Sequence, residues 1–293
     1  FSINMHRVSS KSDAEAYISR LKEIKRYFSE KKTFMKKQQK RGIYPPKFIY
    51  SKVLDDAKNI ITGKPFQDKN KKSPLFKDFK NKVGDLDLTA KEEKKILKEG
   101  KTALINYVGP AYRSLISFIK KMEGKTEGSR GAWSLPQGRN YYEYRLQKMT
   151  TTDLTASEIH RIGKREVKRL HNEIRDIMKE VNFKGDLHDF FNFMKSERFT
   201  YPDTEEGKKS YLKKTRKIIA KMKKALPRLF QTLPEAELKV KPVEPYREKS
   251  AGIAFYNGPS LEGDRPGIYY VNLYKMADNP KYKMEALAYH EAI

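Results

Sequence analysis

The chain of 293 residues is long enough for one large domain or two of ordinary size, and its composition excludes several classes of protein. It contains no cysteine, which excludes a disulfide scaffold, a Cys-ligated zinc site and thiol catalysis. Hydrophobic residues make up 38%, and no uninterrupted apolar run approaches the roughly 20 residues that span a bilayer. The composition therefore predicts a chain without a transmembrane segment.

The formal net charge of +26 points first to polyanionic partners. The charge is unevenly distributed, since only four of the 63 Lys and Arg residues lie in residues 251–293, together with five acids. Residues 208–228 hold ten Lys or Arg and no acid, which is typical either of a nucleic-acid or anionic-membrane surface or of a solvated lysine-rich face. Neither a Gly-rich phosphate loop nor an RNA-binding aromatic signature accompanies this run, so we favour the solvated face and expect no nucleic-acid partner.

Capping signals and apolar periodicity predict a mainly helical N-terminal part. Ser12 with Glu15 forms a capping-box pattern before a helix that ends by Gly42, and a second helix follows the Pro45-Pro46 pair. Residues 63–73 are lysine-rich and polar, as in a loop. Capping boxes also begin at Thr89 and Thr155, and the predicted helices occupy residues 12–42, 46–61, 90–108, 111–124, 156–181, 187–196 and 206–230. Gly109-Pro110 is expected to end or kink the helix that Thr89 opens.

The pattern changes after residue 236. Residues 237–243, 251–256 and 267–273 have the alternation and β-rich composition of short strands, separated by turn-forming segments. A last helix is expected to begin near Pro280. The sequence thus predicts a mainly α fold, a multi-helix assembly with a small β-sheet before the final helix. We divide it into a helical part, residues 1–130, and residues 131–293, which carry the sheet, as parts of one continuous domain.

Both ends of the sequence resemble cuts in a longer protein. The chain begins at Phe1 without an initiator Met or a signal-peptide pattern, and it stops at Ile293 within an apolar helical pattern. We therefore expect the sequence to be an internal piece of a longer polypeptide.

The most specific local feature is the pair His290-Glu291 in the last predicted helix. In metallohydrolases with such a pair, the histidine binds zinc and the glutamate is the general base for a water whose pKa the metal lowers to about 7. Taken alone, however, the pair is more typical of a helix surface with a structural hydrogen bond, and we favour that interpretation for the dipeptide by itself. The second histidine that would distinguish the two is not among the 293 residues.

Several motifs resemble a large bacterial family, catalogued as domain of unknown function 885. They are Gly131–Tyr142 (GAWSLPQGRNYY), Thr150-Thr151-Thr152, Glu158–Gly163 (EIHRIG), Arg265–Asn272 (RPGIYYVN) and Ala288–Ala292 (AYHEA). The resemblance covers most of residues 40–293. It implies a secreted protein or lipoprotein of the bacterial cell envelope, distantly similar to helical zinc peptidases and gluzincin-like in fold.

The resemblance also implies roles for particular residues. His290 would be a metal ligand, for zinc, and Glu291 the catalytic general base, while the family signature continues with two further histidines beyond Ile293. Gluzincin-type peptidases place an edge strand beside the metal helix, and residues 267–273 are the strand-like run that would fill this place. Because a catalytic zinc site usually has three protein ligands, we expect the 293 residues alone to be inactive.

Five further residues are candidates for substrate binding. Arg139 and Tyr141 follow a predicted tight loop, where Arg139 could bind a substrate carboxylate, although the same loop is equally typical of a structural turn with buried aromatics. Tyr256, Tyr269 and Tyr270 lie on the predicted strands. Since alternate strand positions face opposite sides, Tyr269 and Tyr270 cannot both line one cleft, and one of them is expected to be core.

The sequence thus favours a zinc-dependent peptidase that hydrolyses amides with a metal-activated water. The alternatives are a non-catalytic peptide-binding module on the same fold and a polyanion-binding basic protein. The substrate, the metal and the oligomeric state are not determined by the sequence.

Overall fold

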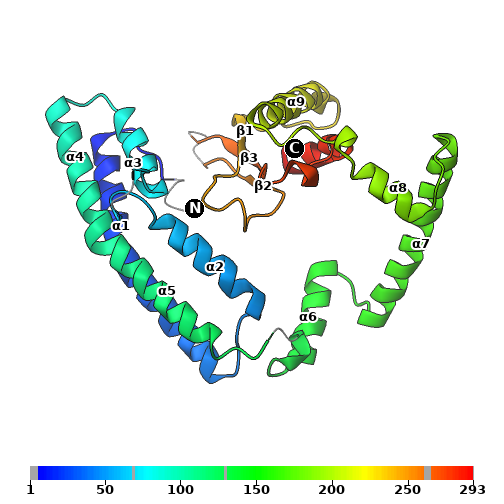
Figure 1. Cartoon of the computed structure of the whole chain (residues 1–293), viewed down its shortest axis with the longest axis horizontal. Coiled ribbons are helices and arrows are strands. Elements are labelled where there is room, and N and C mark those ends of the chain that lie inside the picture. Colours follow the sequence, from blue (N-terminus) through cyan, green and yellow to red (C-terminus); the bar gives the residue numbers. More distant parts are fainter. Residues whose placement is uncertain (1–5, 68–69, 129–130, 261–264, 293) are drawn as a thin grey trace. The chain divides into compact units, whose positions relative to one another are not determined.

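A computed structural model describes residues 6–67, 70–128, 131–260 and 265–292, and the chain forms two compact units, Phe1–Tyr142 and Glu143–Ile293 (Figure 1). The fold is mainly α, with one three-stranded sheet in the described part of the chain, as the sequence predicts. None of the helices within these ranges is both long and apolar enough to cross a membrane.

Unit 1 is helical. Its helices are α1 (Lys11–Lys40), α2 (Lys47–Ile60), α3 (Pro74–Gly84), α4 (Ala90–Ala103) and α5 (Gly109–Glu123). A π-helical turn, Leu104–Val108, joins α4 to α5 and ends where the sequence predicts an end or a kink. The wider π turn accommodates Pro110, whose ring and missing N–H do not fit an α-helix interior.

Helix α1 runs parallel to the α4–α5 helix, as Figure 1 shows. The Lys11 ammonium lies 3.0 Å from the Glu92 carboxylate, and the Lys32 ammonium donates to the Ser114 hydroxyl over 2.7 Å. The contact nearer the start of α1 is made with α4 and the later one with α5, so the two helices run in the same direction. The core between the helices of unit 1 contains the fully buried side chains Tyr17, Leu21, Phe79, Val83, Leu104 and Val108.

The starts of the helices test the predicted caps. The Thr89–Glu92 capping box is confirmed, with both reciprocal hydrogen bonds present. The predicted Ser12 cap is wrong, because Ser10 is the N-cap of α1 and its hydroxyl accepts from the Asp13 backbone N–H. Helix α3 is not among the predicted helices, although Ser73 caps it and Pro74 occupies its first turn.

Unit 2 combines helices with the sheet. Helix α6 (Gly138–Thr150) crosses the boundary between the units. It is followed by α7 (Ala156–Glu180), α8 (Leu187–Met194), α9 (Glu205–Lys223), β1 (Leu238–Pro242), β2 (Ala254–Asn257), β3 (Gly267–Val271) and α10 (Met284–Ala292). The Thr155–Glu158 capping box at α7 is confirmed.

The strands are ordered β1-β3-β2, with β1 parallel and β2 antiparallel to β3. Tyr269 in the middle of β3 is paired with Val240 of β1 and with Tyr256 of β2. Residues 267–271 therefore form the central strand, and their expected place at an edge is wrong. All five residues of β3 are buried, since the strand is covered along both sides.

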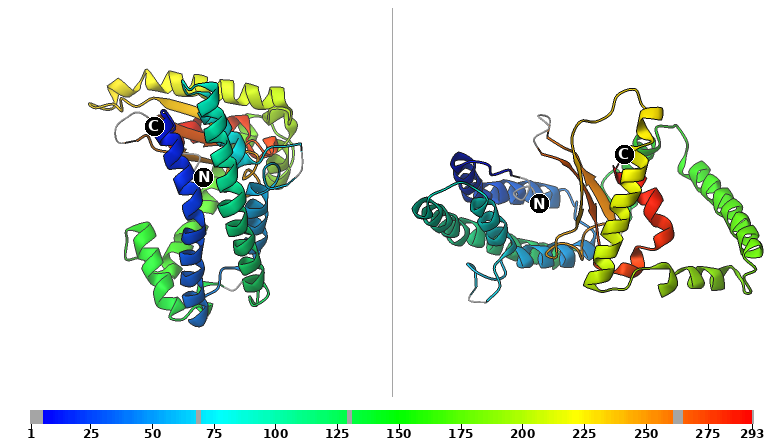
Figure 2. Two further views of the ribbon diagram at one scale, coloured as in Figure 1. Left: turned by 90° about the vertical axis from the view of Figure 1, so that its left-hand side faces the viewer. Right: turned by 90° about the horizontal axis from the view of Figure 1, so that it is seen from above.

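Helices α9 and α10 cover one face of the sheet, and the right-hand view of Figure 2 shows both on the same side of the strands. The core at this interface comprises Tyr211, Ile218, Ile219, Val240, Tyr269, Val271, Leu273, Met276, Met284 and Ala288. On the other face Tyr270 stacks on Phe255 with ring centroids 4.9 Å apart, and the Arg247 guanidinium lies over both rings.

Candidate functional site

The predicted metal-binding pair lies at the end of α10, which is held against the sheet by two side chains of its first two turns. Met284 and Ala288 are buried in the core that contains Tyr269 and Val271 of β3. They are four residues apart, so they lie on one face of the helix, and the residues that follow Ala288 are placed by that anchoring. The last turn of α10 carries His290 and Glu291.

His290 is exposed, and among the residues that the structure describes it has neither a hydrogen-bond partner nor an ion pair. Its neighbour Tyr289 is engaged, because the Tyr289 hydroxyl donates to the Glu285 carboxylate over 2.5 Å. That hydrogen bond raises the pKa of the Tyr289 phenol. The His290 imidazole is thus not buried in an apolar interior.

The side chain of Glu291 is less exposed than that of His290. It is half-buried, and its negative charge opposes ionisation of the fully buried Tyr269. Burial first, then the Tyr211 hydroxyl and the Glu291 carboxylate, raise the pKa of Tyr269 well above its usual value. Glu291 is thus the smallest of these three contributions to the pKa of Tyr269.

The three candidate tyrosines occupy different environments. Tyr269 and Tyr270 are 0% and 5% exposed and lie on opposite faces of β3, so both belong to cores. Tyr256 is 46% exposed, and it pairs with Tyr269 on the face that α10 covers. Its ring lies over Gly267, where an added Cβ would collide with the ring. Tyr256 is therefore the one of the three candidate tyrosines whose side chain is exposed.

Arg139 and Tyr141 lie in unit 1, in the first turn of α6. The tight loop that the sequence predicts is present: Gln137 has φ 54, and the Gly138 backbone N–H donates to the Leu135 carbonyl over 2.8 Å. Gly138 is buried against the Ala132 carbonyl, which leaves no space for a side chain. Arg139 and Tyr141 are both exposed at the mouth of this turn.

The donor set at the end of α10 does not complete a zinc site. His290 and Glu291 are adjacent, and within the described ranges no third histidine or acid joins them in a group close enough to hold a metal. A catalytic zinc site usually has three protein ligands.

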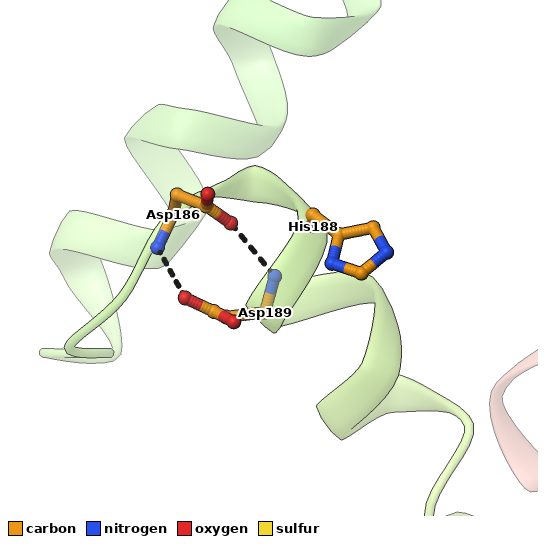
Figure 3. A group of neighbouring side chains, drawn as sticks. All are labelled: Asp186, His188 and Asp189. Atoms are coloured by element: carbon orange, nitrogen blue, oxygen red, sulfur yellow. Dashed lines mark hydrogen bonds between the residues drawn. The ribbon is translucent and has the colours of Figure 1, made fainter.

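One group of potential ligands escaped the sequence analysis. Asp186, His188 and Asp189 at the start of α8 hold their ligand atoms within 4.8 Å of one another (Figure 3). The cluster is explained by helix capping, because Asp186 accepts from the Asp189 N–H and Asp189 accepts from the Asp186 N–H. The sequence signal that could have identified this group is the Asp-x-x-Asp spacing of Asp186 and Asp189, which is typical of a helix start. All three residues are exposed, and the group is a helix start.

A hollow of unit 2 lies between α7 and α8. It has a volume of about 720 Å³ and is lined by Arg175, Met178, Lys179, Phe183, Gly185, Asp186, Leu187, His188 and Phe191. None of the residues predicted from the sequence to bind substrate or metal lines it.

The chain is similar to a solved protein described as "the putative lipoprotein from Colwellia psychrerythraea". The two share 23% sequence identity with a TM-score of 0.89, and the match covers 99% of this chain and 49% of the other. The fold is therefore shared, and the chain spans about half the length of that relative. No curated protein matches the chain.

The sequence model of a bacterial family matches residues 2–293, almost the whole chain. This extent includes every motif that carries the resemblance noted in the sequence, from the Trp133 loop to His290-Glu291. The chain belongs to the family described as "Bacterial protein of unknown function (DUF885)".

Proposed function

We propose that this chain is part of a zinc-dependent hydrolase of the bacterial envelope that cleaves amide bonds in peptides. In this proposal His290 is one metal ligand and Glu291 is the general base. The observation that supports it is the adjacent pair at the end of α10, an exposed histidine followed by a half-buried carboxylate, on a helix that Met284 and Ala288 pack against the sheet. The envelope location rests on the likeness to a protein described as a lipoprotein.

The residues of this chain would have the following roles in the reaction. Glu291 would take a proton from the attacking water and pass it to the leaving amine. Tyr256, exposed on β2 on the same face of the sheet, would contact a side chain of the peptide. The bound metal would supply Lewis-acid activation of the water. Tyr269 and Tyr270 have no part in substrate binding in this proposal, because both are buried.

The remaining zinc ligands would come from polypeptide outside the 293 residues. This follows from the assigned roles, which leave His290 as the one ligand from this pair where three protein ligands are usual. It agrees with the coverage of the solved relative, since this chain corresponds to about half of it. We therefore expect the 293 residues alone to show no hydrolysis.

The test uses the gene product purified from its own host, with zinc content measured by mass spectrometry and hydrolysis measured on a library of quenched fluorescent peptides. Glu291→Gln should keep the metal and lose about 10²-fold or more in kcat, the usual size of a general-base contribution. His290→Ala should lose both metal and activity. His188→Ala, which alters an exposed histidine at a helix start, should change neither.

Two results would contradict the proposal. Equal zinc content in the native protein and in His290→Ala would show that His290 is not a metal ligand. Peptide binding without cleavage, unchanged in Glu291→Gln, would instead support a non-catalytic peptide-binding module.

A further inference from the structure

Helix α7 carries an apolar stripe that the described part of the chain leaves exposed. Val167, Leu170, Ile177 and Val181 are 51%, 45%, 47% and 59% exposed, and Ile174 between them is half-buried. Their spacing alternates three and four residues, which is the repeat of a helix that packs along another helix. An amphipathic helix in a globular protein normally turns such a stripe toward a core.

The partner of α7 within unit 2 covers one edge of the stripe. Helix α8 packs on α7, and the contacts lie at Met178, which is 7% exposed, and at His171, whose ring is 6.2 Å from that of Phe191. With 3.6 residues per turn, Met178 lies about 40° around the helix from Ile174 but about 100° from Ile177. The hollow of about 720 Å³ lies on the same side as Met178. Contact with α8 therefore covers the stripe beside Ile174 and leaves Leu170, Ile177 and Val181 exposed.

We propose that the apolar stripe of α7, residues Val167, Leu170, Ile174, Ile177 and Val181, is the docking surface for a helix of the polypeptide that corresponds to the unmatched half of the Colwellia lipoprotein. The match to that protein covers 99% of this chain but 49% of the relative, so the relative has as much polypeptide again. The occupant is a helix because the three-four spacing presents knobs and holes to a helix crossing at about 20°.

The flanks of the stripe argue against a second copy of this chain as the occupant. One flank is the side of His171 and Met178, which α8 already covers, so a parallel pair of α7 helices would have to displace α8. The other flank carries Glu166, Glu173 and Glu180. In an antiparallel pair these acids would face the same acids of the second copy, and like charges in that arrangement are destabilising.

This inference is independent of the proposed chemistry. It rests on the exposure and spacing of the apolar residues of α7 and on how much of the solved relative the match covers. The proposed metal ligand His290 has no part in it. Loss of hydrolysis or of zinc would leave it standing, and failure of the docking would leave the assignment of His290 and Glu291 to be decided by its own experiment.

The test is site-specific photocross-linking in the gene product produced in its own host. The photoreactive residue p-benzoyl-phenylalanine replaces Leu170 in the stripe, or Lys168 as the matched control about 160° around the same helix. Cross-linked peptides are identified by mass spectrometry. We expect the probe at 170 to cross-link to a segment that aligns with the unmatched half of the Colwellia lipoprotein, in the same polypeptide or in a separate one. We expect this product to be lost with the probe at 168.

Three outcomes would overturn the inference. They are cross-links from position 170 to residues 156–181 of another copy, cross-links only to residues elsewhere in the 293, and the absence of any product at 170 beyond that at 168. The first would make the stripe a self-association surface, and the second would mean that the chain covers its own stripe.

Discussion

The carboxylate of Glu291 acts on the hydroxyl of Tyr269, and this relationship joins the end of α10 to the central strand of the sheet. The two residues are 22 positions apart in the sequence and come from different elements. Burial, with the Tyr211 hydroxyl and the Glu291 charge, raises the pKa of Tyr269. Ionisation of the Tyr269 phenol is therefore sensitive to the charge of Glu291, and it can be measured in the chain without any metal or substrate.

Replacement of Glu291 by Gln should lower the pKa of Tyr269, because the substitution removes one of the negative charges that oppose ionisation of the phenol. The remaining burial should keep the value above the ordinary 10.0. The measurement is an alkaline titration of tyrosine Cζ by carbon-13 NMR. Glu285→Gln is the matched control, since Glu285 binds Tyr289 and should lower the pKa of that residue only. An unchanged Tyr269 in Glu291→Gln would mean that the charge of Glu291 does not act on this phenol.

The chain should lose stability at alkaline pH through its buried tyrosines. Burial raises the pKa of Tyr112 to about 12, and burial with the neighbouring Tyr201 raises that of Tyr211 to about 12. A folded-state pKa above the unfolded value of 10.0 stabilises the fold fully below pH 10, and this contribution is lost as the pH rises from 10 toward 12. Urea unfolding across that range should follow this course, with a shallower fall in Tyr211→Phe. A flat profile would contradict the burial of these phenols.

Gly100→Ala should destabilise unit 1 by about 1–3 kcal/mol, the usual cost of overpacking. Gly100 is buried in α4, and an added Cβ would collide with the ring of Phe79, which is 0% exposed and stacks on Tyr17 with centroids 4.9 Å apart. Gly84→Ala is the control, because nothing lies within 4 Å of its added Cβ and the substitution should be neutral or stabilise by about 0.4–1 kcal/mol. Chemical denaturation measures both. Equal effects of the two substitutions would argue against the close contact of α3 with α4.

Leu170→Glu and Ile177→Glu, singly or together, should change the free energy of unfolding of the 293-residue chain by no more than about 0.5 kcal/mol each, as substitutions at exposed positions do. Met178→Ala, one position along but buried against α8, should cost about 2 kcal/mol or more. Denaturation of the chain alone gives both values. Strong destabilisation by Leu170→Glu would show that the chain itself buries the stripe.

Local signals in the sequence determined most of the helices. The Thr89–Glu92 and Thr155–Glu158 capping boxes are confirmed because both partners of a cap lie within four residues, and no distant contact is needed to form them. The same logic misplaced the start of α1, where Ser10 with Asp13 offers an equal pattern two residues earlier. It also missed α3, although Ser73-Pro74 has the signature of a helix start.

Local sequence signals did not predict how the strands pair or which candidate residues are buried. The residue pattern identified His290-Glu291 and three strands, but not that residues 267–271 form the central strand or that Tyr269 and Tyr270 are both buried. Those outcomes depend on β1 and β2 pairing with β3 from opposite sides and on α9 and α10 covering one face. Likewise, apolar periodicity predicted the helix at residues 156–181 without saying what covers its apolar side.

The sequence by itself determined the class of fold, the family motifs and the adjacent imidazole and carboxylate, since each depends on residues close together in the chain. Only the tertiary structure decided which tyrosine is exposed, which strand is central and that α10 packs on the sheet. The physical reason is that burial and electrostatic contact depend on pairing between segments far apart in sequence, and the energy of that pairing is not encoded in any one of them.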